Sequence, residues 1–350
     1  MAEFAPALIA WQKTHGRHDL PWQNTRDPYK VWLSEIMLQQ TQVVTVKDYF
    51  ARFLVAHPTV ASLAAASLDD VLALWSGLGY YSRARNMHRC AQDVVALHGG
   101  AFPQTAEVLQ TLPGIGPSTA AAVASLCFSE RVAILDGNVK RVLTRLLGFE
   151  ADLAKSANEK ALWQLATQVL PQGGKPDDLW TAMPHYTQGV MDLGATLCTT
   201  RNPNCLLCPV EKLCAAKKAG NPEAYPVKTK TLKRTSQSIW LLWATQPDGS
   251  VYLEQRPTPG VWAGLYCLPV FDSFEALKAV ILPADASLLQ DGEVFKHVLT
   301  HKDLHIHPVR LQMVEKPKPA ALKIKGNWIA ADAWPALGLP APVRKLLGTI

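Results

Sequence analysis

Long uninterrupted hydrophobic runs are missing from this chain of 350 residues, although 48% of its residues are hydrophobic. No window reaches the ~18 consecutive apolar residues of a membrane-spanning helix. The start, MAEFAPALIAWQKTHGRHDL, also lacks a basic patch followed by an apolar block and a small-residue cleavage site. We therefore expect a protein that is neither secreted nor membrane-spanning.

Charged residues are sparse at 18%, and the formal net charge is +6. Most of this excess precedes residue 237, and the stretch PVKTKTLKRTS at 226–236 carries positive charges only. A moderate basic bias suits a polyanionic partner, but ordinary solvated surfaces have it too. Composition alone does not choose between these two interpretations.

Alternating strand patterns are absent from the first 220 residues, and the chain shows no internal repeat. Apolar residues instead recur at spacings of three and four, which predicts an all-α region with helical patterns at 32–54, 71–74, 90–97, 120–126, 139–147 and 162–170. The Pro-, Lys- and Thr-rich stretch 221–236 is typical of an exposed linker. Short β-branched and aromatic runs follow it (SIWLLWAT, VYLEQR, HIHPVRLQMV, NWIAAD), so residues 237–350 are predicted to form a separate α+β domain.

The seven cysteines are unevenly placed. Three are isolated among apolar residues and are interpreted as small buried hydrophobes, namely Cys90, Cys127 and Cys267. The other four lie in one loop at 198–214 with the spacing C-x6-C-x2-C-x5-C, namely Cys198, Cys205, Cys208 and Cys214. Four clustered thiols predict a metal centre, either a structural Zn²⁺ or an iron–sulfur cluster. The paired C-x2-C arrangement of a zinc ribbon is missing, which favours iron–sulfur in a structural role.

The segment LPGIGPSTAAAV joins two helical patterns through a turn that contains Gly114 and Gly116. A glycine turn that leads into a helix exposes backbone N–H groups that can bind a phosphate, although a plain helical hairpin has the same pattern. In the next segment, VAILDGNVKRVL, Asp136 precedes a helix. Its carboxylate is expected to be held ionised by N–H groups and the helix dipole, whether it is a functional residue or only an N-cap.

Glu35 stands in the apolar helical segment KVWLSEIMLQQTQVV. Burial disfavours the charged form of a carboxylate and raises its pKa. Glu35 is therefore expected to hold a proton near neutral pH, in contrast to Asp136.

Taken in order, these segments resemble the helix–hairpin–helix base-excision DNA glycosylases, and among them the adenine-specific branch. The resemblance lies in LPWQ, VWLSEIMLQQTQV, GLGYYSRARN, LPGIGPSTA, ILDGNVKRVL, MDLGA, the cysteine loop and RPTPGVWAGLYCLP. It implies a glycosylase domain at 1–220, built from a six-helix lobe and a lobe with a 4Fe–4S cluster, then the linker and a Nudix-like domain at 237–350 that recognises 8-oxoguanine. The R-E-x-x-E-E carboxylates of a Nudix hydrolase are missing, so we expect no pyrophosphatase activity.

The resemblance also implies residue roles. Glu35 protonates the imidazole ring of adenine, and Asp136 stabilises the sugar cation, electrostatically or through a covalent intermediate, because glycosidic cleavage needs an acid and a negative charge. The other implied positions are the adenine-pocket wall (Leu20, Trp22), the groups that fill the gap left by the flipped base (Gln40, Tyr80), a polar neighbour of the aspartate (Asn138), phosphate contacts (Gly114, Gly116, Lys140), the 8-oxoguanine readers (Thr300, His301) and the cluster ligands (Cys198, Cys205, Cys208, Cys214).

Three departures from the family pattern stand out. Leu299, Thr300 and His301 replace the usual Phe-Ser-His, which keeps a hydroxyl but loses an aromatic ring. His18 stands where some relatives have arginine. Arg201 is the one basic residue in the first cysteine interval.

Ser118 decides between two branches of the superfamily. Bifunctional lyases carry a lysine there, whose amine forms a Schiff base, and a serine cannot form one. The sequence thus predicts a monofunctional glycosylase that excises adenine opposite 8-oxoguanine or guanine in duplex DNA, acting as a monomer in the cytoplasm, or at the nucleoid in a bacterium. The alternatives are a bifunctional endonuclease or lyase acting on oxidised pyrimidines, a non-catalytic DNA-binding homologue, and a redox carrier.

Overall fold

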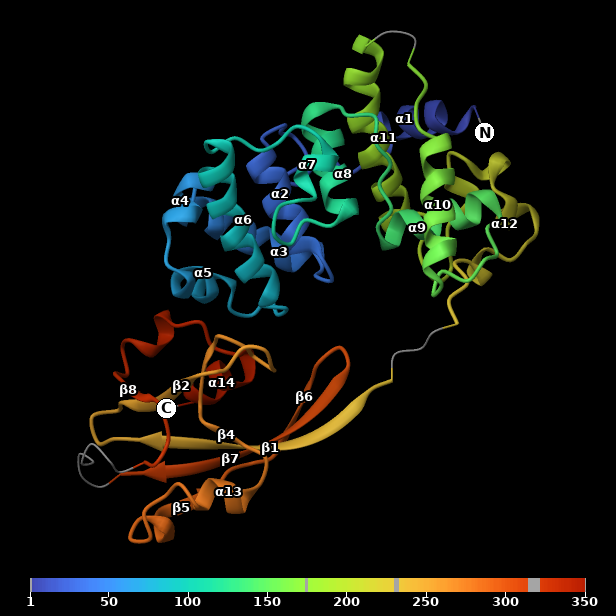
Figure 1. Ribbon diagram of the computed structural model, residues 1–350. Coiled ribbons are helices and arrows are strands. Elements are labelled where there is room, and N and C mark those ends of the chain that lie inside the picture. Colours follow the sequence, from blue (N-terminus) through green and yellow to red (C-terminus); the bar gives the residue numbers. More distant parts are fainter. Residues whose placement is uncertain (1, 174–175, 230–232, 314–321, 350) are drawn as a thin grey trace. The chain divides into compact units, whose positions relative to one another are not determined.

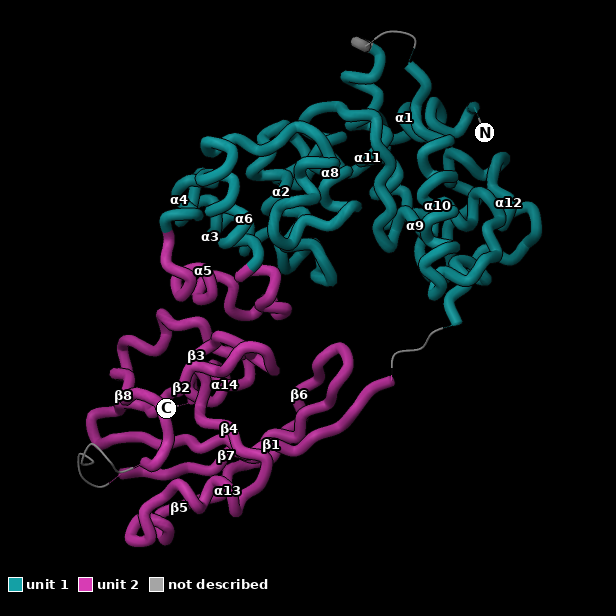
Figure 2. The backbone as a smooth tube through the Cα atoms, in the orientation of Figure 1, with its two compact units in different colours: residues 1–65, 86–231 teal, residues 66–85, 232–350 magenta. Residues whose placement is uncertain are grey.

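The computed structural model describes residues 2–173, 176–229, 233–313 and 322–349. The chain forms two compact units, residues 1–65 with 86–231 and residues 66–85 with 232–350 (Figure 1, Figure 2). No helix in the described ranges is long and apolar enough to cross a membrane.

The first unit is helical, as predicted. Short loops join its helices, which are α1 (Phe4–His15), α2 (Pro28–Leu38), α3 (Val43–Ala56), α4 (Val60–Ala65), most of α6 (Ser82–His98), α7 (Ala106–Leu109), α8 (Pro117–Phe128), α9 (Gly137–Leu147), α10 (Ser156–Gln168), α11 (Pro176–Thr196) and α12 (Ala215–Lys218). Single 3-10 turns lie at Cys205–Leu207, Glu211–Leu213 and Pro222–Ala224.

The sequence showed one helical pattern over 32–54, but the structure has two helices there, α2 and α3. The carboxylate of Asp27 accepts a hydrogen bond from the Tyr29 N–H, and Pro28 occupies the first turn, so α2 begins there. It ends at Leu38 because Gln40 has a φ of 57° and cannot continue a right-handed helix. α3 then starts at Val43.

The beginning of the predicted linker is tied to the first unit. Tyr225 is buried, the Leu153 N–H donates to the Val227 carbonyl at 3.0 Å, and Asp152 accepts from Thr229. This part of the stretch 221–236 is therefore not free chain. Residues 230–232 of that stretch lie outside the described residues, as does Val314 at the end of the expected strand run 305–314.

The second unit contains a mixed sheet ordered β3-β2-β1-β7-β5, in which β4 also pairs with β1, β6 with β7 and β8 with β2. The central strands β1 (Thr235–Thr245) and β7 (Lys302–Gln312) are parallel, and the other pairs are antiparallel. The remaining strands are β2 (Val251–Gln255), β3 (Tyr266–Cys267), β4 (Val270–Phe271), β5 (Leu289–Asp291), β6 (Phe295–Val298) and β8 (Asn327–Ile329). This sheet agrees with the predicted α+β domain, and β1, β2, β7 and β8 match the four expected runs.

Alternate residues of the central strands enter two different cores. Leu241 and Trp243 pack with Val343 of α14 (Ala341–Leu347), whereas Leu242 packs with Leu277 of α13 (Phe274–Lys278). The sheet therefore lies between two helices, since the side chains of a strand alternate between its faces.

Residues 66–85, which include α5 (Leu68–Trp75), belong to the second unit although the sequence places them in the helical region. Ser76 and Tyr81 each donate a hydroxyl hydrogen bond to the Leu339 carbonyl, at 3.1 and 2.9 Å. A Cβ at Gly338 would lie 2.7 Å from the Cβ of Leu72, so only glycine permits this close approach. Tyr80 is thus held in the same unit as Thr300, and their hydroxyls are hydrogen-bonded.

Candidate functional site

Glu35 and Asp136 line one pocket of about 190 Å³ in the helical unit. Helix α2 carries Glu35, and Asp136 is the N-cap of α9, so two separate helices bring the carboxylates together. The pocket is lined by Arg17, Leu20, Trp22, Val31, Ser34, Glu35, Leu38, Thr41, Val43, Leu126, Asp136, Asn138, Gln188, Met191 and Ala195. Five predicted site residues therefore meet here, namely Leu20, Trp22, Glu35, Asp136 and Asn138.

Glu35 has the electrostatic setting expected of an acid. Its neighbours in α2 include the buried Ser34 and Ile36. Desolvation by burial, with a smaller contribution from the negative charge of Asp136, raises the pKa of Glu35 from 4.5 to about 7. A substantial fraction of the Glu35 side chains is therefore protonated at neutral pH.

Asp136 is an N-cap, as predicted, and its Oδ1 accepts a hydrogen bond from the Val139 N–H at 2.7 Å. Burial nevertheless raises its pKa above the usual 3.8, against the opposing effects of the Val139 and Asn138 N–H groups and of Arg141 and Lys140. The helix terminus alone does not set the charge state, since desolvation is the largest influence. The cap and the two cations limit how far the pKa rises.

Three further polar residues belong to this site although the sequence did not predict them, namely Arg17, Gln188 and Asp192. Asp192 is fully buried, and its carboxylate accepts from the Arg17 Nε at 2.7 Å and from the Gln188 Nε2 at 3.0 Å. Arg17 and Gln188 line the pocket, so the buried carboxylate orients two of its polar groups. The spacing of Gln188 and Asp192, four residues apart in one helix, is the signal that could have identified them.

A close contact between α9 and α11 fixes one side of the pocket. Arg141 donates to the Asn138 Oδ1 at 2.9 Å, to the Gly194 carbonyl at 2.6 Å and, through Nε, to the Cys198 carbonyl at 2.7 Å. A Cβ at Gly194 would lie 2.8 Å from the Asn138 Cβ and 3.1 Å from the Asn138 carbonyl oxygen. Gly194 therefore allows the start of α9, which carries Asp136, to lie directly against α11.

Gly194→Ala is expected to destabilise the protein by about 1–3 kcal/mol, because the new methyl group meets backbone atoms that cannot rotate away. It is also expected to slow catalysis by displacing Asn138 and Asp136. Thermal unfolding and single-turnover rates measure the two effects. Gly137→Ala is the matched control for stability, since nothing lies within 4 Å of a Cβ there. An unchanged melting temperature for Gly194→Ala would contradict the close contact.

The predicted phosphate contacts and Ser118 do not line this pocket. Gly114 has a φ of 75°, and a Cβ there would lie 2.7 Å from the Asn86 Cβ, whereas Gly116 is the N-cap of α8 with open space around it. The Ser118 hydroxyl accepts from the Leu135 N–H at 3.3 Å. Lys140 pairs with Glu159 at 2.5 Å, so a phosphate would compete with that carboxylate for the ammonium group.

Four of the predicted DNA-reading residues also lie outside the pocket lining. Gln40 is exposed at the end of α2. Tyr80 is 43% exposed and has a φ of 49°. Thr300 and His301 lie between β6 and β7 in the second unit.

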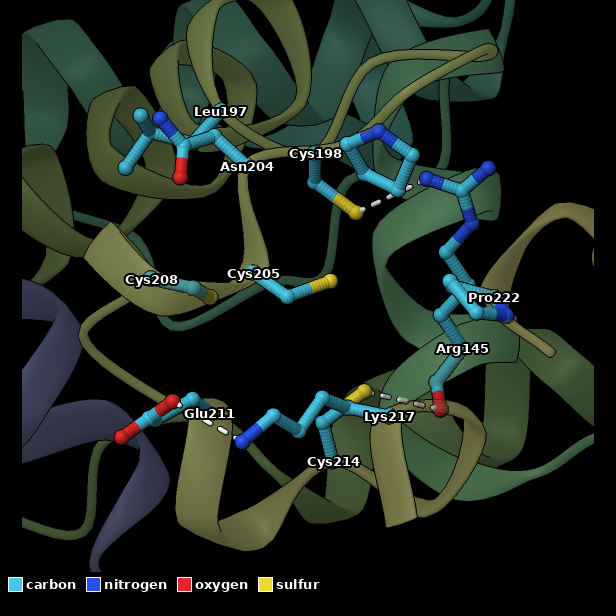
Figure 3. Close-up of a pocket in the computed structure, with 11 residues that line it drawn as sticks. Arg145, Leu197, Cys198, Asn204, Cys205, Cys208, Glu211, Cys214, Lys217 and Pro222 are labelled. Atoms are coloured by element: carbon cyan, nitrogen blue, oxygen red, sulfur yellow. Dashed lines mark hydrogen bonds and ion pairs between the residues drawn. The ribbon is translucent and has the colours of Figure 1, made fainter. Parts of the chain in front are cut away.

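The four clustered cysteines surround one cavity, with Cys198 beside the buried Arg145 (Figure 3). The Arg145 Nη1 donates to the Cys198 Sγ at 3.4 Å and to the Thr199 carbonyl at 2.6 Å. A single tetrahedral Zn²⁺ needs its sulfurs about 3.8 Å apart. No group of three His, Cys, Asp or Glu residues within the described ranges is arranged to hold one metal ion. The four thiols therefore line one cavity without standing in the arrangement that a single bound ion would have. The isolated Cys90, Cys127 and Cys267 are buried, as predicted.

Comparison with known proteins defines the class first. Residues 33–168 match the family "HhH-GPD superfamily base excision DNA repair protein", and residues 240–349 match "NUDIX domain". A solved structure of a thermostable thymine-DNA glycosylase is 30% identical with a TM-score of 0.52, and the match covers 62% of this chain and 95% of that one. The chain is therefore a base-excision repair protein with a helical glycosylase fold and a Nudix-like domain.

The particular family follows from near full-length relatives. The adenine DNA glycosylase of Buchnera aphidicola (subsp. Acyrthosiphon pisum) is 36% identical over 98% of this chain and 96% of the relative. The human adenine DNA glycosylase is 44% identical over 61% of this chain and 39% of its own length. This chain belongs to the adenine DNA glycosylase family, which confirms the predicted enzyme class.

Proposed function

We propose that this enzyme removes adenine mispaired with 8-oxoguanine, or with guanine, by acid-assisted hydrolysis of the N-glycosidic bond. The observation that carries the proposal is the pair of carboxyl groups on one base-sized pocket, with the Glu35 pKa raised to about 7 and Asp136 capped by the N terminus of α9. An acid and an anion facing one pocket are the groups that glycosidic cleavage requires.

The chemistry follows from these two settings. The Glu35 carboxyl group gives its proton to an imidazole-ring nitrogen of the extruded adenine, and the electrons of the C–N bond leave with the base. Positive charge develops on the sugar, and the Asp136 carboxylate stabilises it. Water then adds to the sugar carbon and loses a proton, which leaves free adenine and an abasic site. Leu20 and Trp22 supply the apolar walls against which the base packs, and Asn138 stands beside Asp136.

The absence of an amine supports a monofunctional reaction. Among the residues that line the described pocket none is a lysine, and Ser118 bonds the backbone next to Asp136. Without an amine nucleophile no Schiff base forms, so the DNA strand is expected to stay intact after base removal. The presence of both Glu35 and Asp136 at one pocket also argues against a non-catalytic DNA-binding homologue.

Residues outside the pocket are proposed to bind the duplex, with the enzyme acting as a monomer in the cytoplasm or at a bacterial nucleoid. Base removal needs the adenine to leave the stack, and Tyr80 and Gln40 would fill the gap that it leaves. Gly114, Gly116 and Lys140 would contact phosphates, and Thr300 and His301 would read the opposite base. Cys198, Cys205, Cys208 and Cys214 would hold a 4Fe–4S cluster that braces the loop after α11.

A duplex with adenine opposite 8-oxoguanine tests the proposal directly. The enzyme is incubated with this duplex, and half of the sample is then treated with alkali. Free adenine in both halves, with strand breaks only after alkali, supports a monofunctional adenine glycosylase. Strand breaks without alkali would show a lyase, and no adenine release would reject the proposal. A visible absorbance band, typical of iron–sulfur proteins and absent from a zinc form, tests the cluster.

The excision rate is expected to depend on pH through both carboxyl groups. The acid must be protonated, so the single-turnover rate should fall about tenfold per pH unit above the Glu35 pKa of about 7. The rate should also fall in acid, as Asp136 takes up a proton at a pH above its ordinary value of 3.8. The measurement uses saturating enzyme, so that DNA binding does not limit the rate. A flat profile between pH 6 and pH 9 would contradict the role of Glu35.

A further inference from the structure

The loop between β6 and β7 is tied to the residues at the start of β1. Arg234 donates from Nη1 to the Thr300 carbonyl at 3.1 Å and from Nη2 to the Leu299 carbonyl at 3.0 Å. The Thr235 N–H donates to the His301 carbonyl at 3.0 Å. Three successive carbonyls of this loop are therefore held by two adjacent residues that lie about 65 positions earlier in the chain.

Charge reinforces these contacts. The Asp303 carboxylate accepts from the Arg234 Nη2 on one oxygen and from the Lys296 Nζ, at 2.6 Å, on the other. Lys296 and Arg234 together hold the pKa of Asp303 below its usual value. The Arg234 guanidinium thus bonds two carbonyls and one carboxylate at once, and its rigid planar fork suits such a task.

Thr300 and His301 are both exposed, so hydrophobic burial does not hold them, whereas Leu299 packs against the core that lies between the sheet and α14. The loop is also held by the Leu299 N–H, which donates to the Lys302 carbonyl at 2.8 Å, and by the bond between the Thr300 and Tyr80 hydroxyls. Exposed residues lose conformational entropy when they are ordered, so specific bonds are needed to hold Thr300 and His301. Arg234 supplies such bonds at the two residues that precede His301.

We propose that Arg234 is a positioning residue that holds Leu299, Thr300 and His301 in the conformation that reads the base opposite the adenine. This inference rests on the proposed function, in which Thr300 and His301 contact 8-oxoguanine. Arg234 acts through the loop backbone and takes no part in bond cleavage. A preordered loop loses less freedom when it binds DNA, so the arginine strengthens recognition without changing the chemical step.

The test measures dissociation constants on duplexes whose target is 2′-fluoro-2′-deoxyadenosine, which resists cleavage, placed opposite 8-oxoguanine or guanine. Arg234→Gln is expected to weaken binding to the 8-oxoguanine duplex by about tenfold, because charged hydrogen bonds to the loop are lost. Binding to the guanine duplex should change less. Arg234→Lys should recover part of the preference for the 8-oxoguanine duplex. The single-turnover rate of Arg234→Gln on unmodified adenine at saturating enzyme should match that of the wild type.

Arg310→Gln is the matched control. Arg310 is an exposed arginine on β7 whose guanidinium lies over the Trp243 ring, 4.4 Å from its centroid, and whose strand position pairs with Gln290 of β5 and not with the loop 299–301. Its replacement should leave the preference for 8-oxoguanine unchanged. Asp303→Asn should add little to the effect of Arg234→Gln, because both substitutions break the same cluster of bonds.

The outcomes separate the two proposals. If the wild-type enzyme shows no preference for 8-oxoguanine, the proposal that Thr300 and His301 read the opposite base is wrong, and the proposed role of Arg234 is rejected as well. If the wild type discriminates and Arg234→Gln discriminates equally well, only the role of Arg234 is overturned. A fall in the saturating excision rate that matches the loss of affinity would also overturn it, because that result indicates a general structural defect.

Discussion

Glu35→Gln is expected to lower the single-turnover rate of adenine excision by about 10²–10⁴-fold, because the variant cannot donate a proton to the leaving base. The side chain keeps its size and its place on α2, so the pocket and DNA binding should be retained. The rate is measured at saturating enzyme on a duplex with adenine opposite 8-oxoguanine. Glu107→Gln, an exposed glutamate on α7, is the matched control and should keep the wild-type rate.

The same substitution is expected to stabilise the fold at alkaline pH. The Glu35 pKa rises from 4.5 in the unfolded chain to about 7 in the folded protein. Between these two values the unfolded chain has lost a proton that the folded state keeps, so wild-type stability falls as pH rises through this window. Glu35→Gln removes this penalty, and its free energy of unfolding at pH 8 should exceed that of the wild type by about 1–3 kcal/mol.

At pH 4 the stabilities of Glu35→Gln and the wild type should converge, since Glu35 is protonated in both states. A variant that is less active and less stable at pH 8 would point to structural damage instead of a lost acid. Chemical denaturation at the two pH values, together with the rate, distinguishes these results. The combination of lost activity and gained stability is typical of a functional group that is strained by burial.

Asp136→Asn is expected to lower the excision rate by about 10²–10³-fold, because the carboxylate that faces the developing sugar cation is gone. Asparagine is as good an N-cap as aspartate, so α9 should still begin at Gly137. Stability at pH 7 should rise slightly, since burial raises the Asp136 pKa and its ionisation in the folded state is therefore unfavourable. Single-turnover kinetics and thermal unfolding measure both effects.

Asp27→Asn provides the matched control for Asp136→Asn. Asp27 is also an aspartate N-cap, and its Oδ1 accepts from the Tyr29 N–H at 2.9 Å at the start of α2, but it does not line the pocket. If the two substitutions affected the rate equally, the effect would belong to the loss of any carboxylate at a helix N terminus and not to the charge at the pocket. A rate for Asp136→Asn within tenfold of the wild type would contradict the proposed stabilising role.

The sequence predicted the local features of this protein well. The period of apolar residues indicated the helices, Asp136 was recognised as an N-cap, and the β-branched runs identified the main strands. These features depend on neighbours within a few positions, which a single sequence displays. The break between α2 and α3 was missed because it depends on the backbone of Gln40, and glutamine carries no turn signal.

The sequence alone could not predict contacts between residues that lie far apart in the chain. Asp192 gives no sign in the sequence that it is fully buried or that it bonds Arg17, 175 positions away. Likewise, burial in the folded protein raises the pKa of Asp136, and local sequence patterns do not show that burial. The sequence of residues 66–85 predicts that they belong to the helical region, but their contacts place them in the second unit, which contains the sheet.

On the proposed roles, the placement of residues 66–85 puts the groups that read the opposite base in one unit and the groups that cleave the bond in the other. Tyr80 and Thr300 share a compact unit, whereas Glu35 and Asp136 belong to the other. On the proposed roles, changes in the second unit alter how tightly the base opposite the adenine is held, while the barrier to bond cleavage is set in the first unit, which also contributes duplex contacts. Preference for the opposite base and the rate of the chemical step can then be adjusted separately, and a change at Thr300 need not weaken the acid.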